Sequence, residues 1–379
     1  MASLRSTTVP SPDSDSGPLS QPAVHRIALY PGDGIGKEVI AEAVRVLRSV
    51  EERGGGFRLD TTTFDWGVTH WERTERVVPE GFLSVLASFD AILLGAVGWP
   101  ASIPDHVTLA PLKRIRQAFD LYACVRPSKL PPGVPCPLAG KGPQDIDMVV
   151  IRENSEGEYV DSGGRFRVGE PEEIAVQSAV HTRRGVERIL RFGFELARKR
   201  RRRLVMATKS NAQSYAYVLW DDVLAEVASK YPDVVAERQH ADALLMNLVR
   251  RPEAIDVVVA SNLFGDLLTD LSSAIAGGLG LAPSANLDPE RRRPSLFEPV
   301  HGSAPDIAGK GIANPVAAIL AAGMMLEWLG HAAAASAIQR AVEESLAAGA
   351  ATLDLGGRLG TTEMTDRVLE RLPATIASI

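Results

Sequence analysis

Residues 255–286, with the sequence IDVVVASNLFGDLLTDLSSAIAGGLGLAPSAN, decide the fold class of this chain. Their first part, residues 255–260, is a β-branched run with a single acid, which is typical of a strand buried on both faces of a mostly parallel sheet. Ser261, Asn262 and Gly265 supply a turn, and apolar residues then recur at helical spacing. A buried strand that leads through a turn into such a helix indicates an α/β fold.

Two acidic residues of the predicted helix, Asp266 and Asp270, lie four positions apart and project from one face. They follow the carboxyl end of a buried strand, where ligands bind in open α/β sheets. Two carboxylates at this spacing repel each other unless a cation lies between them. Oxygen ligands favour a hard ion such as Mg²⁺ or Mn²⁺. From this pair alone, a solvated acidic helix face remains the alternative.

Length and composition limit the class of protein. A chain of 379 residues can bury a large core and is expected to hold two domains. Its 41 basic and 47 acidic residues give a net charge of −6. This is not the excess of positive charge that is typical of proteins that bind nucleic acid or an anionic membrane. Cys124 and Cys136 are its two cysteines, so we expect a reducing compartment, a cytoplasmic location and no disulfide framework. No apolar stretch is uninterrupted enough to span a bilayer, and the Ala-rich residues 317–335 predict a packed helix.

Two segments have unusual composition. Residues 1–24 are rich in Ser and Pro and lack an apolar core, which excludes a secretory signal. Asp13, Asp15 and the single Arg5 favour a disordered N-terminal extension over a transit peptide. The basic run at residues 198–203 directly precedes a predicted strand and is interpreted as a solvated helix end.

The rest of the chain alternates predicted strands with predicted helices. The glycine turn at residues 31–36 is similar to a dinucleotide-binding turn, but Lys37 replaces the third glycine, so it predicts only strand, turn and helix. Residues 297–306 form a rigid loop whose backbone amides can approach a ligand. The strands are expected at residues 26–30, 57–64, 89–97, 148–151, 204–208 and 255–260, and the helices at 37–50, 180–198, 215–231 and, after Asn314 and Pro315, as two helices separated by residues 353–362.

Polar residues follow several of these predicted elements, which indicates a site assembled from strand exits. Arg116, Arg126 and Arg152 suggest an acidic substrate, because the guanidinium fork pairs with carboxylates. A surface salt bridge is the alternative for each arginine taken alone. Lys209 follows another predicted strand, and Asp242 begins a later helix.

Five motifs now identify a resemblance: PGDGIGKE from residue 31, RENSEGEY from 152, TKSN from 208, ASNLFGDLLTDL from 260 and EPVHGSAPDIAGKGIANP from 298. From about Arg26 to the C-terminus the chain resembles the β-decarboxylating dehydrogenases of 2-hydroxy acids, the group of isopropylmalate, isocitrate, homoisocitrate and tartrate/D-malate dehydrogenases. The sequence GAVGWPASIPDHVTL at 95–109 looks like the tartrate/D-malate branch. The resemblance implies an isopropylmalate dehydrogenase-like, two-domain αβα sandwich with a mostly parallel sheet and a dimer arm after Tyr159. It also implies a cofactor-side domain of residues 25–121 and 280–379 and a substrate, metal and dimerisation domain of residues 122–279.

The resemblance also implies roles for individual residues. Asp306 stands where a carboxylate receives the ribose hydroxyls of NAD and would repel a 2′-phosphate, so NAD is expected over NADP. The metal ligands would be Asp266 and Asp270 of one subunit and Asp242 of the other subunit of a homodimer with shared sites. Carried over in full, the roles are proton transfer by Tyr159 and Lys209, substrate binding by Arg116, Arg126, Arg152 and Leu112, and cofactor binding by Asn211, His301, Gly302, Ser303, Ala304, Pro305, Asp306 and Asn314.

The reaction implied is oxidation and decarboxylation of a hydroxy-dicarboxylate. The cofactors implied are NAD and Mg²⁺ or Mn²⁺, and a monovalent cation such as K⁺ is a further candidate cofactor. D-malate, giving pyruvate and CO₂, and tartrate are the expected substrates. The resemblance implies that the side chain one helical turn before Arg116 faces the group on C3 of the substrate. Leu112 holds that place, and it would also suit the isopropyl group of 3-isopropylmalate. Two hypotheses from different classes are a non-catalytic regulatory homologue and a metal-dependent phosphate-ester enzyme. The missing P-loop Lys-Thr pair argues against the phosphate-ester enzyme.

Overall fold

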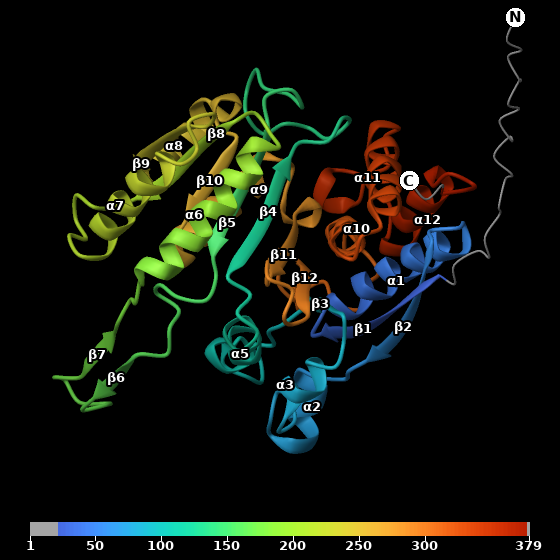
Figure 1. The fold of residues 1–379 in the computed structure, drawn as a ribbon. Helices are drawn as coiled ribbons and strands as arrows, with labels where there is room; N and C mark the ends of the chain where they lie inside the picture. The colour runs from blue at the N-terminus through green and yellow to red at the C-terminus, as the bar shows by residue number, and fades with distance from the viewer. Residues whose placement is uncertain (1–21, 377–379) are drawn as a thin grey trace, which may run out of the picture.

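A ten-stranded sheet runs through the computed structural model, which describes residues 22–376 (Figure 1). Six of its nine neighbouring strand pairs are parallel, which confirms the predicted mostly parallel α/β sheet. The predicted extension at residues 1–24 lies almost wholly outside the described residues. From one edge to the other the strands are β2 (Phe57–Thr63), β1 (Ala23–Gly32), β3 (Ala91–Ala96), β12 (Ser295–Pro299), β11 (Pro283–Leu287), β4 (Ala123–Lys129), β5 (Asp147–Glu153), β10 (Val257–Ala260), β8 (Arg203–Thr208) and β9 (Val235–His240).

The three antiparallel pairs lie together in the middle of the sheet. They join β12 to β11, β11 to β4 and β4 to β5. The parallel strands on one side of this region therefore run opposite to the parallel strands on the other side. The β11–β12 hairpin was not among the predicted strands.

Helices cover both faces of the sheet. On the β1–β3–β12 side, α1 (Gly36–Glu52) and α10 (Val316–Trp328) pack on one face, with α11 (Ala332–Ala347) and α12 (Thr361–Arg371) behind them. The opposite face there contacts α3 (Phe82–Leu86) and α5 (Ala110–Ala118) through apolar side chains. The remaining helices are α2 (Val68–Thr74) and α4 (Asp105–Thr108) next to α3 and α5 in the chain, and α6 (Arg183–Arg198), α7 (Ala216–Ala228), α8 (Ala241–Arg250) and α9 (Asn262–Ile275) on the β5–β10–β8–β9 side.

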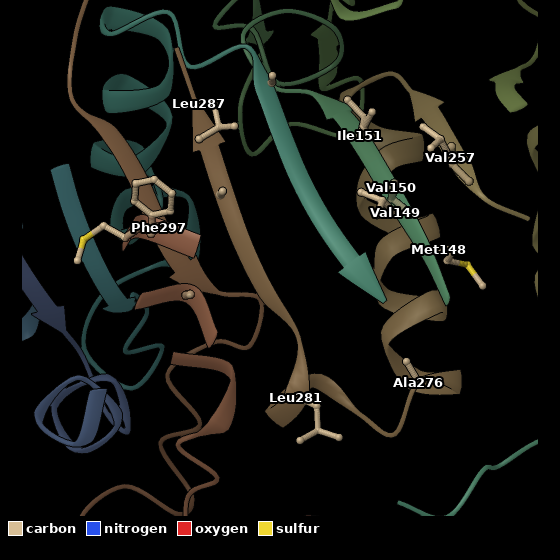
Figure 2. Close-up of a cluster of buried hydrophobic side chains, with 14 of the residues drawn as sticks. Met148, Val149, Val150, Ile151, Val257, Ala276, Leu281, Leu287 and Phe297 are labelled. Carbon is tan, nitrogen blue, oxygen red and sulfur yellow. The ribbon is translucent and has the colours of Figure 1, made fainter. Parts of the chain in front are cut away.

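The buried core is apolar and continuous through the middle of the sheet. Figure 2 shows part of it, with the side chains of residues 148–151 on β5, Val257 on β10, Leu287 on β11 and Phe297 on β12. The predicted β-branched strand at residues 255–260 is β10, and all four of its residues are buried. No helix within residues 22–376 is both long and apolar enough to cross a membrane.

A small hairpin projects from the body of the molecule (Figure 1). Its strands, β6 (Gly163–Phe166) and β7 (Ile174–Gln177), pair only with each other in the described part of the chain. Backbone hydrogen bonds in both directions between Gly157 and Val180 close its base. This segment is the arm expected after Tyr159, and we call it the β6–β7 arm.

Two further expectations differ from the structure. The region after Pro315 contains three helices rather than two, because Gly330, at φ 98°, interrupts the chain between α10 and α11. The expected single helix at residues 317–335 is therefore wrong. The basic run at residues 198–203 is also more than a solvated helix end: Arg200 Nε lies 2.8 Å from a carboxylate oxygen of Asp256, whose side chain is fully buried.

Candidate active site

A cavity of about 190 Å³ lies over the antiparallel middle of the sheet, between α5 and α9. The side chains of the three predicted substrate arginines, which are more than 90% buried, converge here from α5, β4 and β5, and their binding of substrate stays a prediction. Each arginine pairs with a carboxylate inside the protein, so the alternative of separate surface salt bridges is wrong. The polar and charged lining residues are Arg116, Arg126, Arg152, Tyr159, Asp266, Glu298 and His301.

Strand register explains why these side chains meet. Cys124 on β4 lies opposite Arg152 on β5, and Ser284 on β11 lies opposite Glu298 on β12. Alternate residues of a strand share one face, so Arg126 joins Cys124 on the same face. The site is thus built on the face of the central strands, rather than only at strand exits as the sequence suggested.

Asp266 is the centre of the charged contacts. Its Oδ1 accepts hydrogen bonds from Arg126 Nη1, at 3.2 Å, and from Arg152 Nη1, while Tyr159 donates its hydroxyl to Oδ2 at 3.0 Å. Burial acts to raise the pKa of Asp266, but Arg152 and Arg126 outweigh it and hold the pKa below its usual value. Burial, and then the Asp266 charge, raise the pKa of Tyr159. Near neutral pH the contacts of Asp266 therefore combine its carboxylate with two guanidinium groups and a protonated phenol.

Asp270 lies one helical turn beyond Asp266 on α9. Burial, followed by repulsion from Asp266, raises the pKa of Asp270. A divalent cation beside both carboxylates would relieve this repulsion, so the donor chemistry fits Mg²⁺ or Mn²⁺. Among residues 22–376 of one chain, however, no three Asp, Glu, His or Cys side chains are grouped to hold a metal. The resemblance assigns the third carboxylate, Asp242, to the other subunit, and that assignment stays a prediction.

Glu298 is a site residue that the sequence reasoning missed. Its Oε1 accepts from Arg116 Nη2 at 2.7 Å and from Asn286 Nδ2 at 2.8 Å. Asn286 in turn accepts from Asn154 Nδ2 at 2.8 Å, just beyond Arg152. This buried chain of polar groups connects α5 to the end of β5. The EPVHG motif contained Glu298, but its partner lies 182 positions away in the sequence.

Lys209, Asn211 and Asp242 do not line this cavity of their own chain; the resemblance assigned Asp242 to the site of the other subunit and gave Lys209 and Asn211 roles in the same reaction as Tyr159. Lys209 follows β8, and its Nζ lies 3.1 Å from Asp242 Oδ1 at the start of α8. The Asp242 side chain is 68% exposed and Asn211 is exposed as well. Lys209 and Asp242 form an ion pair on the surface of the β8–β9 edge, which we call the Lys209–Asp242 pair, and Asn211 lies two residues after Lys209 in the chain.

A second cavity, of about 330 Å³, lies beside the first and shares His301 with it. Its walls are largely apolar, and they include three of the predicted cofactor residues, His301, Ala304 and Asn314. Gly302 lines the first cavity, Ser303 is buried, and Pro305 and Asp306 are exposed outside both cavities. Asp354 lines this second cavity and accepts a hydrogen bond from Asn314 Nδ2 at 3.1 Å; the sequence reasoning missed it.

The predicted glycine turn lies against the same region. Ile35 N donates to Ser303 O at 2.9 Å, and Ile35 lines the second cavity. A Cβ on Gly34 would lie 2.0 Å from that same Ser303 oxygen, so only glycine permits this approach. The turn therefore packs against the 301–306 loop.

Known proteins resemble this chain over most of its length. A probable tartrate dehydrogenase/decarboxylase of Agrobacterium vitis is 49% identical over 346 residues, covering 91% of this chain and 96% of that protein. The D-malate dehydrogenase [decarboxylating] of Escherichia coli K12 is 50% identical over 351 residues, covering 90% of this chain and 97% of that protein. The crystal structure of isocitrate dehydrogenase from Methylococcus capsulatus superposes with a TM-score of 0.83 at 36% identity, covering 92% of this chain and 99% of that chain. Residues 26–368 match the isocitrate/isopropylmalate dehydrogenase family, and the chain belongs to that family and has its α/β fold.

Proposed function

We propose that the protein oxidises and decarboxylates a 2-hydroxy dicarboxylic acid, with D-malate or tartrate as substrate, NAD as cofactor and Mg²⁺ or Mn²⁺ as metal. The observation that carries this proposal is the convergence of three buried arginines on a small cavity beside Asp266 and Tyr159. The similarity to tartrate and D-malate dehydrogenases supports the choice of substrate.

The charges of the cavity suit a small diacid. Arg116, Arg126 and Arg152 can together pair with two carboxylates, and the guanidinium fork orients each carboxylate as well as neutralising it. All three arginines are already paired with a protein carboxylate, Arg116 with Glu298 and both Arg126 and Arg152 with Asp266, so the cavity balances the added charge only in part.

The apolar wall favours 3-isopropylmalate as the second candidate. Leu112 and Leu109 of the α5 region line the cavity, and Leu112 is buried. Leucines at this place can contact an alkyl group on C3 of the substrate, whereas the hydroxyl group of tartrate would find no hydrogen-bond partner on them. D-malate, which carries only hydrogens on C3, is compatible with either arrangement.

We assign the metal to Asp266 and Asp270 with Asp242 of the partner subunit. A divalent cation bound there would polarise the 2-hydroxyl group of the substrate and stabilise negative charge on the same oxygen after oxidation. Arg126 and Arg152 hold Asp266 ionised, which keeps it ready as a ligand.

The second cavity suits the adenosine end of NAD. Its apolar walls, with Ile35 and Ile307 among them, can pack on an adenine ring, and Asp354 can accept hydrogen bonds from ribose hydroxyls. Negative charge from Asp354, and from Asp306 in the adjacent loop, disfavours the 2′-phosphate of NADP. His301, shared by both cavities, would lie between the adenosine and the substrate.

A homodimer would bring the Lys209–Asp242 pair to the cavity of the other subunit. Two apolar surfaces support such an assembly: the β6–β7 arm exposes Phe166, Ile174 and Val176, and α8 and α9 expose Met246 and Leu267. Exposed apolar groups on neighbouring elements are characteristic of interaction surfaces. A two-fold dimer would complete both sites at once.

In this arrangement each residue has a definite chemical task. Lys209 of the partner subunit takes the proton of the 2-hydroxyl group as the hydride on C2 passes to NAD⁺. The bond between C3 and the β-carboxylate of the resulting 2-oxo acid then breaks and CO₂ leaves; the electron pair of that bond forms the C2=C3 double bond of an enolate, and the carbonyl pair moves to the oxygen on C2. Tyr159 then donates a proton to C3, and its raised pKa keeps the phenol protonated near neutral pH for that step.

An assay of NADH fluorescence tests this proposal. Purified protein with NAD and Mn²⁺ is given D-malate, tartrate, 3-isopropylmalate and isocitrate separately, with EDTA and NADP as controls. We expect D-malate or tartrate to give the highest kcat/KM, with CO₂ released and EDTA stopping turnover. A preference for 3-isopropylmalate would favour the second candidate, and inactivity with all four acids would contradict the proposal.

A further inference from the structure

We infer that Glu158 is a positioning residue. It fixes Tyr159 relative to helix α9, so that the hydroxyl of Tyr159 stays within hydrogen-bond distance of Asp266 on that helix. The inference rests on the proposed function in one respect, the role of Tyr159 as proton donor. Glu158 directly precedes Tyr159 but directs its carboxylate away from the cavity, toward α7 and the beginning of α9.

The carboxylate of Glu158 bridges two elements. Its Oε1 accepts the hydroxyl of Tyr217, on α7, at 2.9 Å, and Ser261 Oγ lies 3.3 Å from the same oxygen. Its Oε2 accepts the backbone N–H of Leu263, in the first turn of α9, at 3.0 Å. Ser261 precedes α9 but makes no capping hydrogen bond to it. Glu158 therefore accepts the hydrogen bond of the Leu263 N–H, a group in the first turn of the helix that a capping residue usually binds.

This bridge connects the two partners of the central hydrogen bond. Tyr159 follows Glu158 in the chain, and Asp266 follows Leu263 by one helical turn. A shift of the 156–159 loop relative to α9 would therefore change the distance between the Tyr159 hydroxyl and Asp266 Oδ2, now 3.0 Å. An error of about 1 Å in such a pair can cost ~10²-fold in rate.

His181 closes the remaining side of Glu158. Its Nδ1 accepts from Trp220 Nε1 at 3.1 Å, so the ring proton of the neutral imidazole lies on Nε2. That Nε2 is buried, has no hydrogen-bond partner among residues 22–376, and lies 3.9 Å from Glu158 Oε1. No lysine or arginine of the described chain forms an ion pair with Glu158, so neutral donors and the beginning of α9 stabilise its charge.

The matched control is Glu156 in the same loop. Its carboxylate accepts two hydrogen bonds from Thr182, at 2.8 and 2.7 Å, and in the described chain it accepts none from α9 or α7; the backbone oxygen of Glu156, which a side-chain substitution keeps, accepts from Asn262 Nδ2 at 3.0 Å. Removing either side chain costs the loop two or more hydrogen bonds, but of these two side chains only that of Glu158 is hydrogen-bonded to α9. Glu156→Ala is therefore expected to lower stability without a specific effect on kcat.

The test compares Glu158→Ala, Glu158→Gln and Glu158→Asp. For Glu158→Ala with D-malate we expect kcat to fall by ~10- to 100-fold with KM changed by less than about twofold, because the substrate arginines are untouched. Gln keeps the length of the side chain and can accept from Leu263 while donating to the hydroxyl of Tyr217. We expect it to retain kcat within about threefold. Asp keeps the charge but is one methylene too short to bridge, so it should be slower than Gln.

A crystal structure of Glu158→Ala supplies a readout other than activity. The Tyr159 hydroxyl should lie beyond about 3.5 Å from Asp266, outside hydrogen-bond range. If Glu158→Ala does not fold, the order of Gln above Asp in kcat decides the question. A Glu158→Ala enzyme with wild-type kcat and an intact Tyr159–Asp266 hydrogen bond would overturn the inference, as would Asp equalling Gln. If the wild type turned over none of the four acids, the proposed function would fail, and the crystallographic distance would still decide the role of Glu158.

Discussion

Asp266 joins more of the site than any other residue, because Arg126, Arg152 and Tyr159 all contact it. Arg152 is bound on its other side by Asn262, whose Oδ1 accepts from both Nε, at 3.1 Å, and Nη2, at 2.7 Å. The guanidinium is thus held in one plane by contacts on two edges. Only a planar fork can make all three contacts.

Arg152→Lys should therefore be damaging although it conserves charge. A lysine can replace one of these hydrogen bonds but not the fork, and we expect a loss of about 2 kcal/mol, or ~30-fold in kcat/KM for the diacid. Steady-state kinetics measure this, with Arg191→Lys, in an exposed pair with Glu187, as the control. Equal kcat/KM for the Arg152 variant and the wild type would remove Arg152 from substrate binding.

Asp270→Asn should stabilise the metal-free protein and abolish metal-dependent turnover. The pKa of Asp270 is raised in the folded state, so the charged form opposes folding, and the folding advantage of the protonated form is lost as pH rises through that pKa. Removing the charge should gain about 0.5 kcal/mol, or about 1–2 °C in Tm, near pH 7.5 in EDTA. The gain should shrink as the pH falls toward the raised pKa. Thermal unfolding of Asp270→Asn and of the wild type at several pH values measures this. A Tm of Asp270→Asn below that of the wild type at pH 7.5 would contradict the prediction.

The sequence located charged residues better than it located their partners. Asp266 and Asp270 could be found because helical spacing places i and i+4 on one face. Glu298 and Asp354 could not, because their contacts with Arg116 and Asn314 depend on which distant strands and loops are neighbours in the fold. Asp306 was expected at the cofactor ribose, but its side chain is exposed beside the second cavity, and that role stays a prediction.

At the scale of secondary structure, long and strongly patterned elements were predictable and short ones were not. Helix α1 and strand β10 matched their patterns within a few residues. The strands β11 and β12 were missed because each carries proline at an end and neither is a continuous β-branched run such as β10. Proline usually marks an edge or a turn, yet here Pro283 and Pro299 face each other at the end of the hairpin.

The β6–β7 arm gives a prediction for a whole element. Replacing residues 163–177 by a short Gly-Ser turn should leave the body folded, because the Gly157–Val180 hydrogen bonds already close the base of the arm. We expect sedimentation to show a smaller assembly than the wild type, together with loss of turnover. As a milder form, Phe166→Ser with Ile174→Thr removes only apolar surface. A shortened chain with wild-type assembly and activity would exclude the arm from the interface.

For the whole molecule, the important feature is that the site residues fall into two separated groups. The arginines, Tyr159 and Asp266 surround the central cavity, whereas the Lys209–Asp242 pair lies apart at the β8–β9 edge. The resemblance assigned Asp242 to the other subunit of a homodimer, so the separation of the two groups within one chain agrees with that expectation, and the shared site itself stays a prediction. The antiparallel middle of the sheet, whose strands the pattern did not reveal, makes the parallel strands on its two sides run in opposite directions, so their carboxyl ends lie at opposite edges of the sheet.

Subunit complementation tests the central claim, a site shared between two chains, most directly. Lys209→Ala and Asp266→Asn should each be inactive and folded, as checked by thermal unfolding. Co-expressed with different tags and purified as a mixture, they form heterodimers in which one site has both intact groups. A random mixture should recover about a quarter of the wild-type activity in a two-fold dimer. If tagged heterodimers form and remain as inactive as the single variants, the shared site is contradicted.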